Sequence, residues 1–214
     1  MKKIAFLALA AITFASCNNN TEPKAETTEK QAAAATDGTA YTVDSTSKVG
    51  WVGSKPTGTH SGTFKVKEGA LTVKDGALTA GSFIIDVASL NNEDLAADAE
   101  SKAKLEGHLK SPDFFDVAKY PTAKFEITGV EVNTDTTKVG ITHIIKGNLT
   151  LKDSTKNVAV PAKVTVDAKT LAATASFSID RTLWGINYKG PNNPQDWVIS
   201  KEVAIKLNIT ATAK

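Results

Sequence analysis

Residues 171–179 read LAATASFSI, and their alternation decides the fold class. Every second side chain, from Leu171 through Phe177 to Ile179, is apolar, whereas the intervening positions are small or polar. A period of two places the apolar set on the core face of a β-strand and the other set in water. The stretch therefore predicts one strand of an antiparallel sheet.

The same alternation recurs along the chain after residue 40. It is visible in residues 141–152, 158–167 and 197–211. Turn residues separate such runs, and Asp75-Gly76 is typical of a two-residue hairpin turn. The pattern predicts about eight strands, several of them longer than the usual strand. Long strands joined by hairpins favour an all-β fold, an up-and-down antiparallel barrel, and leave a two-sheet sandwich as the alternative.

One segment departs from the strand pattern. Residues 89–110 carry apolar side chains at helical spacing among charged ones, and Pro112 ends the run. The adjacent aromatic residues Phe114 and Phe115 follow. We expect a short helix and an aromatic turn, inserted between strands, to form a lid over one end of the barrel.

The composition of the 214 residues excludes several classes of protein. Lys and Arg number 25 against 23 Asp and Glu, so the chain lacks the net positive charge that is typical of nucleic-acid binding. The single cysteine excludes an intramolecular disulfide and a cysteine-based zinc site. We expect no metal, no catalytic residue and no nucleic-acid partner.

The first residues have the pattern of a bacterial lipoprotein signal. Lys2-Lys3 precede an apolar run that ends in small residues and then Cys17, the only cysteine. This pattern predicts a signal peptide over residues 1–16 and acylation of Cys17, which would anchor the protein in a membrane. An ordinary cleaved signal with an incidental cysteine is the alternative.

The next stretch predicts a tether. Residues 17–39 are rich in Thr, Ala, Glu and Lys and lack aromatic side chains, so we expect the lipidated cysteine to be followed by a flexible coil. The folded domain then covers residues 40–214. Because no acidic run follows Cys17, the expected location is the cell envelope, at the periplasmic face of the outer membrane.

The densest motif of the chain covers residues 108–121, which read HLKSPDFFDVAKYP, and Phe125 follows it. Together they resemble the signature H-L-x-S-x-D-F-F-D-x-x-x-Y-P-x-x-x-F of the YceI-like family of polyisoprenoid-binding proteins. GNLTL at 147–151 and Arg181 with WGI at 184–186 resemble further family elements. The resemblance covers about residues 40–211.

The resemblance implies a lipocalin-like antiparallel β-barrel with an apolar tunnel that holds an isoprenoid chain. It implies a periplasmic or secreted binding protein without enzymatic activity or a cofactor other than the bound lipid. Family members pair through a sheet edge or a mouth, and the sequence leaves a homodimer open.

The expected site has an apolar lining and a few polar groups at the mouth. The tunnel lining comprises Trp51, Phe64, Phe83, Ile85, Phe114, Phe115, Phe125, Ile127, Ile145, Leu149, Phe177, Ile179, Trp184 and Trp197. Lys55, His60 and Arg181 are the candidates for contact with a polar head group, although such an arginine more often pairs with a carboxylate at a barrel end.

Small inward residues predict that the lumen is open. Gly62, Ala123, Gly147, Ala173 and Ala175 lie among the bulky inward residues and would leave volume for a ligand. The alternative is a lumen filled by the lid aromatics. In that case the protein would be a structural or stress-related interaction protein of the cell envelope, which binds partners on its outer face.

Overall fold

The structure is a computed structural model that describes residues 22–190 and 198–214. In these residues it contains ten strands, one α-helix and one short 3-10 helix. In chain order they are β1 (Glu26–Glu29), β2 (Thr39–Val43), β3 (Lys48–Lys55), β4 (Gly58–Lys74), β5 (Ala77–Asn92), α1 (Ala99–Lys110), β6 (Thr122–Val132), β7 (His143–Leu151), β8 (Ser154–Val166), β9 (Thr170–Asp180), η1 (Arg181–Trp184) and β10 (Glu202–Ala213). The predicted signal peptide, Cys17 and Trp197 lie outside the described residues.

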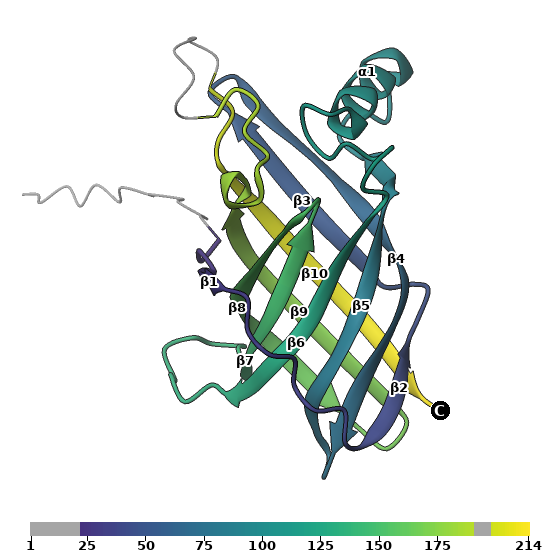
Figure 1. Cartoon of the computed structure of the whole chain (residues 1–214), viewed down its shortest axis with the longest axis vertical. Coiled ribbons are helices and arrows are strands. Elements are labelled where there is room, and N and C mark those ends of the chain that lie inside the picture. The colour runs from purple at the N-terminus through teal and green to yellow at the C-terminus, as the bar shows by residue number, and fades with distance from the viewer. Residues whose placement is uncertain (1–21, 191–197) are drawn as a thin grey trace, which may run out of the picture.

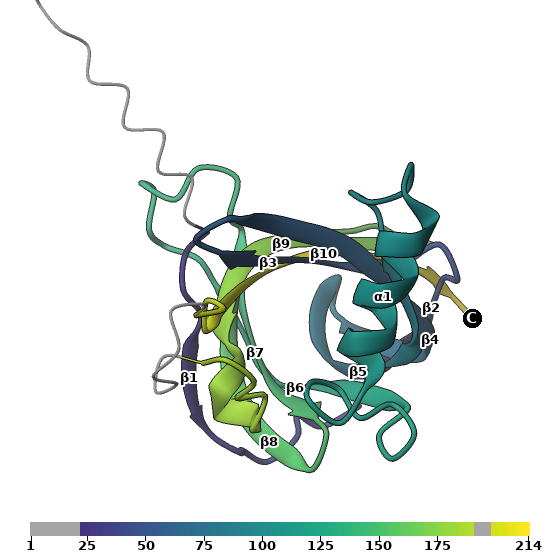
Figure 2. The ribbon, with the colours of Figure 1, turned by 90° about the horizontal axis from the view of Figure 1, so that it is seen from above.

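The strands close into one antiparallel barrel (Figures 1 and 2). From β4 to β10 each strand pairs with the next one in the chain. The barrel closes between β10 and β4 through the short strands β2 and β3. Each of these two strands pairs with both β10 and β4, and the two lie one after the other along the barrel axis. The short strands β2 and β3 therefore share one of eight wall positions. The predicted barrel is confirmed, and the sandwich alternative is wrong.

The alternation that predicts the strands also predicts which side chains face inward. In β9, Leu171, Phe177 and Ile179 are buried, and in β8 the inward residue Val158 is 1% exposed. The hairpin at Asp75-Gly76 joins β4 to β5, and both residues have positive φ, 50° and 78°. These are the backbone angles that a turn of this kind requires.

Helix α1 lies across one side of the barrel opening (Figure 2). It begins later than predicted, because β5 continues to Asn92 and a turn separates the strand from the helix. Asp98 caps the helix, and its carboxylate accepts a hydrogen bond from the Ser101 amide at 3.0 Å. Among residues 22–190 and 198–214, no helix has the length and apolar character that crossing a bilayer demands.

Residues 22–38, here called the N-terminal segment, begin in the barrel wall between β8 and β9 and then run along the outside of the barrel (Figure 1). Strand β1 within it pairs with residues 156–159 of β8. The pairing is available because β9 pairs only with residues 162–166 of β8. This leaves the first half of β8 unpaired along the edge that faces β9, whereas its other edge pairs with β7. This part of the chain therefore differs from the predicted flexible tether.

Candidate functional site

A cavity of about 490 Å³ occupies one half of the barrel. It lies toward the end that carries α1, η1 and the β3–β4 turn, and we call this end the mouth. Its wall comes from β3 to β10, and side chains of α1 and of the turn after it complete it. The lining is mostly aliphatic and aromatic, with polar groups such as Lys55, His60 and Ser200 at the mouth. This volume is in the range of small-molecule sites.

The structure brings most of the predicted lining together around this cavity. The predicted residues that line it are Trp51, Phe64, Phe83, Ile85, Phe114, Phe115, Phe125, Leu149, Phe177 and Ile179. Ile127 and Ile145 instead line a second cavity of about 30 Å³, nearer the opposite end of the barrel. Trp184 lines neither cavity, since its side chain is completely buried and its Nε1 donates to the Leu149 carbonyl at 2.9 Å.

Phe83 and Phe125 separate the two cavities. Both residues line both cavities, and their ring centroids are 5.5 Å apart. Gly147 lies against the Phe125 ring, so that any side chain there would overlap it. Gly69 similarly faces the Phe83 side chain across the strand pair, where an added Cβ would come within 2.6 Å of the Phe83 Cβ. The two rings therefore form the floor of the main cavity.

The expectation that small inward residues leave an open lumen is wrong for the glycines. A Cβ at Gly62 would meet the Trp51 ring at 2.7 Å, and Gly147 makes room for Phe125 in the same way. Ala123 does line the main cavity, whereas Ala173 and Ala175 line the small one. Most of the small inward residues thus make room for aromatic rings or line the small cavity, rather than opening the main one.

Arg181, a candidate for head-group contact, is held by the main chain instead. Its side chain is 4% exposed, and burial lowers the pKa of the guanidinium while Asp180 opposes this shift. Nε donates to the Ser200 carbonyl at 2.9 Å, and Nη2 donates to the Tyr188 and Ile199 carbonyls at 3.0 and 3.1 Å.

A further hydrogen bond from Nη1 of Arg181 goes to the Ile186 carbonyl. Four of its five N–H groups are therefore engaged with carbonyl oxygens. The arginine fixes the residues that follow η1 to the start of β10, so its role at the mouth is to shape the loop. Within residues 22–190 and 198–214, carbonyl oxygens hold this side chain, and the predicted ion pair with a carboxylate is not found there.

His60 belongs to a polar group near the start of β4. Its Nδ1 lies 2.8 Å from Oδ2 of Asp94. Burial raises the pKa of Asp94, but the hydrogen bonds from the Ser61 amide, His60 and Asn92 outweigh it and lower the pKa to about 2. Lys55, which ends β3, is exposed at the mouth. The two predicted residues therefore lie on the rim of the cavity, where His60 is hydrogen-bonded to Asp94 and Lys55 is exposed to water.

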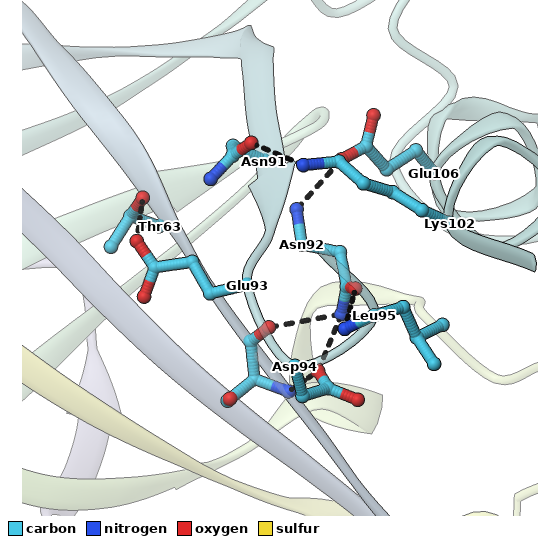
Figure 3. Close-up of polar contacts among 9 residues, drawn as sticks. Thr63, Asn91, Asn92, Glu93, Asp94, Leu95, Lys102 and Glu106 are labelled. Carbon is cyan, nitrogen blue, oxygen red and sulfur yellow. Dashed lines mark hydrogen bonds and ion pairs between the residues drawn. The ribbon is translucent and has the colours of Figure 1, made fainter. Parts of the chain in front are cut away.

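Asn92 attaches α1 to the barrel wall (Figure 3). Its side chain is 0% exposed, and its Nδ2 donates to the Ser61 carbonyl at 3.0 Å and to Asp94 Oδ1 at 2.6 Å. Its Oδ1 accepts from the Leu95 amide, and its own amide donates to Glu106 Oε1 of α1 at 2.7 Å. The side-chain amide thus ties the end of β5 to β4 and to the turn, and the main-chain amide ties it to the helix.

The helix and the turn after it contribute the lid side of the cavity. Leu105 and Leu109 line it from α1, and Phe115 packs edge-on against Phe64 with centroids 5.5 Å apart. His108 stacks edge-on with Tyr188 at 4.8 Å and lies 2.9 Å from Asp113. The predicted aromatic lid is therefore part of the cavity wall, and it leaves the cavity unfilled.

Several lining residues are absent from the predicted set. Val203, Ile205 and Leu207 lie on the apolar side of β10, where the alternation already places them. Leu105 and Tyr188, in contrast, come from the helix and from the loop after η1, where no strand period marks a residue as inward. In the part of the chain that the structure describes, no three His, Cys, Asp or Glu side chains gather as metal ligands.

Comparisons with known proteins agree with this architecture. The family model of the YceI-like domain matches residues 41–211. A UPF0312 protein of Pseudomonas aeruginosa is 45% identical over 62 residues, which are 29% of each chain. A UPF0312 protein of Azotobacter vinelandii is 35% identical over 96 residues, 42% of this chain and 47% of that one. The matched region thus spans less than half of either relative.

Two solved structures share the fold. BcnA of Burkholderia cenocepacia superposes with a TM-score of 0.63 at 24% identity, over 79% of this chain and 99% of that one. A polyisoprenoid binding domain from Saccharophagus degradans superposes with a TM-score of 0.57 at 16% identity, over 82% and 99%. At these identities the likeness concerns the barrel and leaves the ligand to be argued from the cavity.

Proposed function

The chain belongs to the YceI-like domain family, and from this premise we propose that its barrel binds a long apolar lipid of the isoprenoid type, without catalysing a reaction. The observation that carries the proposal is the 490 Å³ cavity with its aliphatic and aromatic lining. The Saccharophagus domain with the same fold is a polyisoprenoid binding domain, which supports the choice of ligand class.

The lining chemistry favours a chain over a polar ligand. Burial of about ten methylene-like carbons contributes about 8 kcal/mol before ordering costs, which corresponds to roughly micromolar affinity. An isoprenoid chain offers more apolar carbon than that. Selectivity then comes from the length and branching of the chain, because the walls around Phe64 and Phe177 offer shape rather than hydrogen bonds.

The open cavity also argues against the alternative of a filled barrel. Phe114 and Phe115, the residues that would fill the lumen, line the cavity from its lid side. A structural or stress-related protein that acts through its outer face has no use for an apolar chamber of this size. The lipid carrier or reservoir is therefore the better proposal.

Membrane attachment is a second part of the proposal, and it rests on the sequence. The charged start, the apolar run and Cys17 support a lipoprotein of the cell envelope, held at the periplasmic face of the outer membrane. With Lys2 and Lys3 removed, acidic and basic side chains balance, so retention would depend on the acyl chains. Mass spectrometry of the mature N-terminal peptide tests the acylation of Cys17.

The ligand proposal is tested by two matched substitutions. Ala123→Phe puts a ring into the main cavity, whereas Ala175→Phe puts the same ring into the small one. Native mass spectrometry of protein purified without detergent should show a bound apolar molecule in the wild type, and this molecule should be lost in Ala123→Phe while the fold persists. Ala175→Phe should lower stability by about 1–3 kcal/mol, because the small cavity cannot hold a ring. A wild-type protein that carries no apolar molecule and takes up none when one is offered would contradict the proposal.

A further inference from the structure

The N-terminal segment begins beside the mouth of the cavity. The Ser178 amide donates to the Pro23 carbonyl at 2.9 Å, and the Ala25 amide donates to the Ser178 carbonyl at 2.9 Å. Ser178 lies between Phe177 and Ile179, two residues that line the main cavity. Lys24 pairs with Glu202 at the first residue of β10 at 3.6 Å. The start of the described chain is therefore fixed at the level of the cavity, in the wall between β8 and β9, where Ala25 is 3% exposed.

The rest of the segment is fixed along its length. The Gln31 amide donates to Oδ1 of Asn148 at 3.0 Å, and Nδ2 of Asn148 returns a hydrogen bond to the Gln31 carbonyl at 2.8 Å. The Ala34 amide donates to the Ile127 carbonyl at 3.0 Å. These bonds follow the pairing of β1 with β8, so residues 23–34 are part of the barrel surface and add no length to a tether.

We infer that the docked N-terminal segment holds the mouth of the barrel toward the bilayer surface, and this inference rests on the proposed acylation of Cys17. Five residue steps separate Cys17 from Glu22, and five steps of extended chain span at most about 18 Å. A tether that ran freely to residue 39 would instead hold the barrel at about 25 Å on average and would leave its orientation open. The docking shortens the free connection between the acylated cysteine and the barrel, and it decides which end of the barrel is near the membrane.

The rim of the mouth offers groups that suit a lipid surface. At the end where the N-terminal segment begins, it carries Lys55, Lys189 and the exposed apolar side chain of Leu183. Both ends of the barrel carry charges of both signs, because acidic residues such as Asp113 lie at the mouth and lysines such as Lys169 lie in the turns at the opposite end. The place where the N-terminal segment docks, rather than net charge, therefore sets the orientation. The interaction surface is thus the rim of the mouth, and its partner is the lipid surface that holds the anchor.

The orientation has a consequence for ligand exchange. A lipid chain that leaves the bilayer enters the cavity over a short path when the mouth faces the membrane. With the opposite end toward the membrane, the same chain would have to cross water along the length of the barrel. The cost of exposing apolar carbon to water on that path scales with its length.

The test places a fluorophore at either end of the acylated, full-length protein. Leu183→Cys carries the probe at the mouth, and Ala168→Cys carries it in the β8–β9 turn at the opposite end. In vesicles of phosphatidylethanolamine and phosphatidylglycerol that contain a nitroxide-labelled phospholipid, the probe at residue 183 should be quenched at least threefold more than the probe at residue 168. Equal quenching, or stronger quenching at residue 168, would overturn the inference.

A longer connection between Cys17 and the barrel provides the second variant. Insertion of 15 Gly and Ser residues between positions 21 and 22 adds about 20 Å of average reach and should abolish the contrast between the two probes. If the difference in quenching between the two probes survives the insertion, the length of this connection does not set the orientation. Flotation with the vesicles distinguishes a failure of the anchor from a failure of the orientation. Protein that does not float lacks the proposed anchor. Protein that floats, but whose probe at residue 168 is quenched more strongly, contradicts only the orientation.

Discussion

The two halves of the barrel follow the same sequence pattern and yet differ in their interior. Along β10, Val203, Ile205 and Leu207 line the main cavity and are only partly buried, whereas Ile209 and Ala211 farther along the strand are 3% and 0% exposed. Nothing in the alternation of β10 distinguishes these residues. The difference comes from what lies opposite them, because the floor made by Phe83 and Phe125 closes off one half and leaves the other empty.

The comparison indicates how a small barrel becomes a binding protein. A barrel with eight wall positions is just wide enough to be filled by its own side chains. Here the half toward the closed end is filled in this way, and it supplies stability. The half toward the mouth stays open, and buried polar groups such as Arg181 and Asn92 hold its rim and lid.

Removal of Phe125 is expected to have the largest effect, because it would break the division between the two halves. Phe125→Ala should lower the free energy of unfolding by about 3–5 kcal/mol and connect the two cavities. Native mass spectrometry should then detect longer bound chains than in the wild type. Phe64→Ala is the matched control, since Phe64 lines only the main cavity. An unchanged chain length in Phe125→Ala, or the same lengthening in the control, contradicts the account of the floor.

Loss of the Arg181 guanidinium should have the second-largest effect on stability. Arg181→Met leaves carbonyl oxygens of the mouth loop without donors, and we expect a loss of about 3 kcal/mol in unfolding by denaturant. Arg181→Lys should restore little of it, because one ammonium cannot reach carbonyls on both sides of the loop. A full rescue by lysine would indicate that the positive charge, rather than the set of hydrogen bonds, holds the loop.

Substitution of the buried residue Asn92 should weaken the attachment of α1 more than substitution of the exposed residue Asn91. Asn92→Ala removes the three side-chain hydrogen bonds that hold the turn before α1 at a site with 0% exposure, and it keeps the main-chain bond to Glu106. We expect a loss of about 1–3 kcal/mol, with faster amide exchange in α1 because the turn that leads into the helix is loosened. Asn91→Ala removes the exposed contact to Lys102 and should change stability by less than about 0.5 kcal/mol. Equal effects of the two substitutions on exchange in α1 would refute this role of Asn92.

The smallest expected effect concerns pH. The pKa of Asp94 in the folded protein is about 2, below its ordinary value of 3.8, so its carboxylate stabilises the folded state fully above about pH 4. This contribution is lost as the pH falls from about 4 toward 2, and it does not change between pH 5 and 8. Denaturation of the wild type and of Asp94→Asn checks the sign, because the variant should lose less stability over this acidic range. An identical pH dependence of the two proteins would contradict it.

The sequence predicts the wall of the barrel well, because one local rule governs it. Alternation in residues 171–179 and 158–167 marks the buried faces of β9 and β8, and Asp75-Gly76 marks a hairpin through its backbone angles. The aromatic lining near the lid is predicted by the signature motif around Phe114. These features depend on neighbours within a few residues of one another.

The rest of the site depends on contacts between distant residues, which the pattern does not contain. The N-terminal segment has little apolar character and docks through its backbone, because the first half of β8 offers an open edge. Gly147 makes room for the Phe125 ring across a strand pair, so its small size does not predict an empty space. Tyr188 reaches the cavity from a loop held by Arg181, and no periodicity marks such a residue.

The central claim is that the open half of the barrel holds an apolar chain. A high-resolution crystal structure of the protein, purified without detergent from its bacterial host, tests this claim most directly. The account predicts continuous chain-shaped density in the main cavity, in contact with Phe64 and Phe115 and ending at Phe125. A cavity that contains only ordered water, or that has closed by inward movement of the lid aromatics, would contradict it.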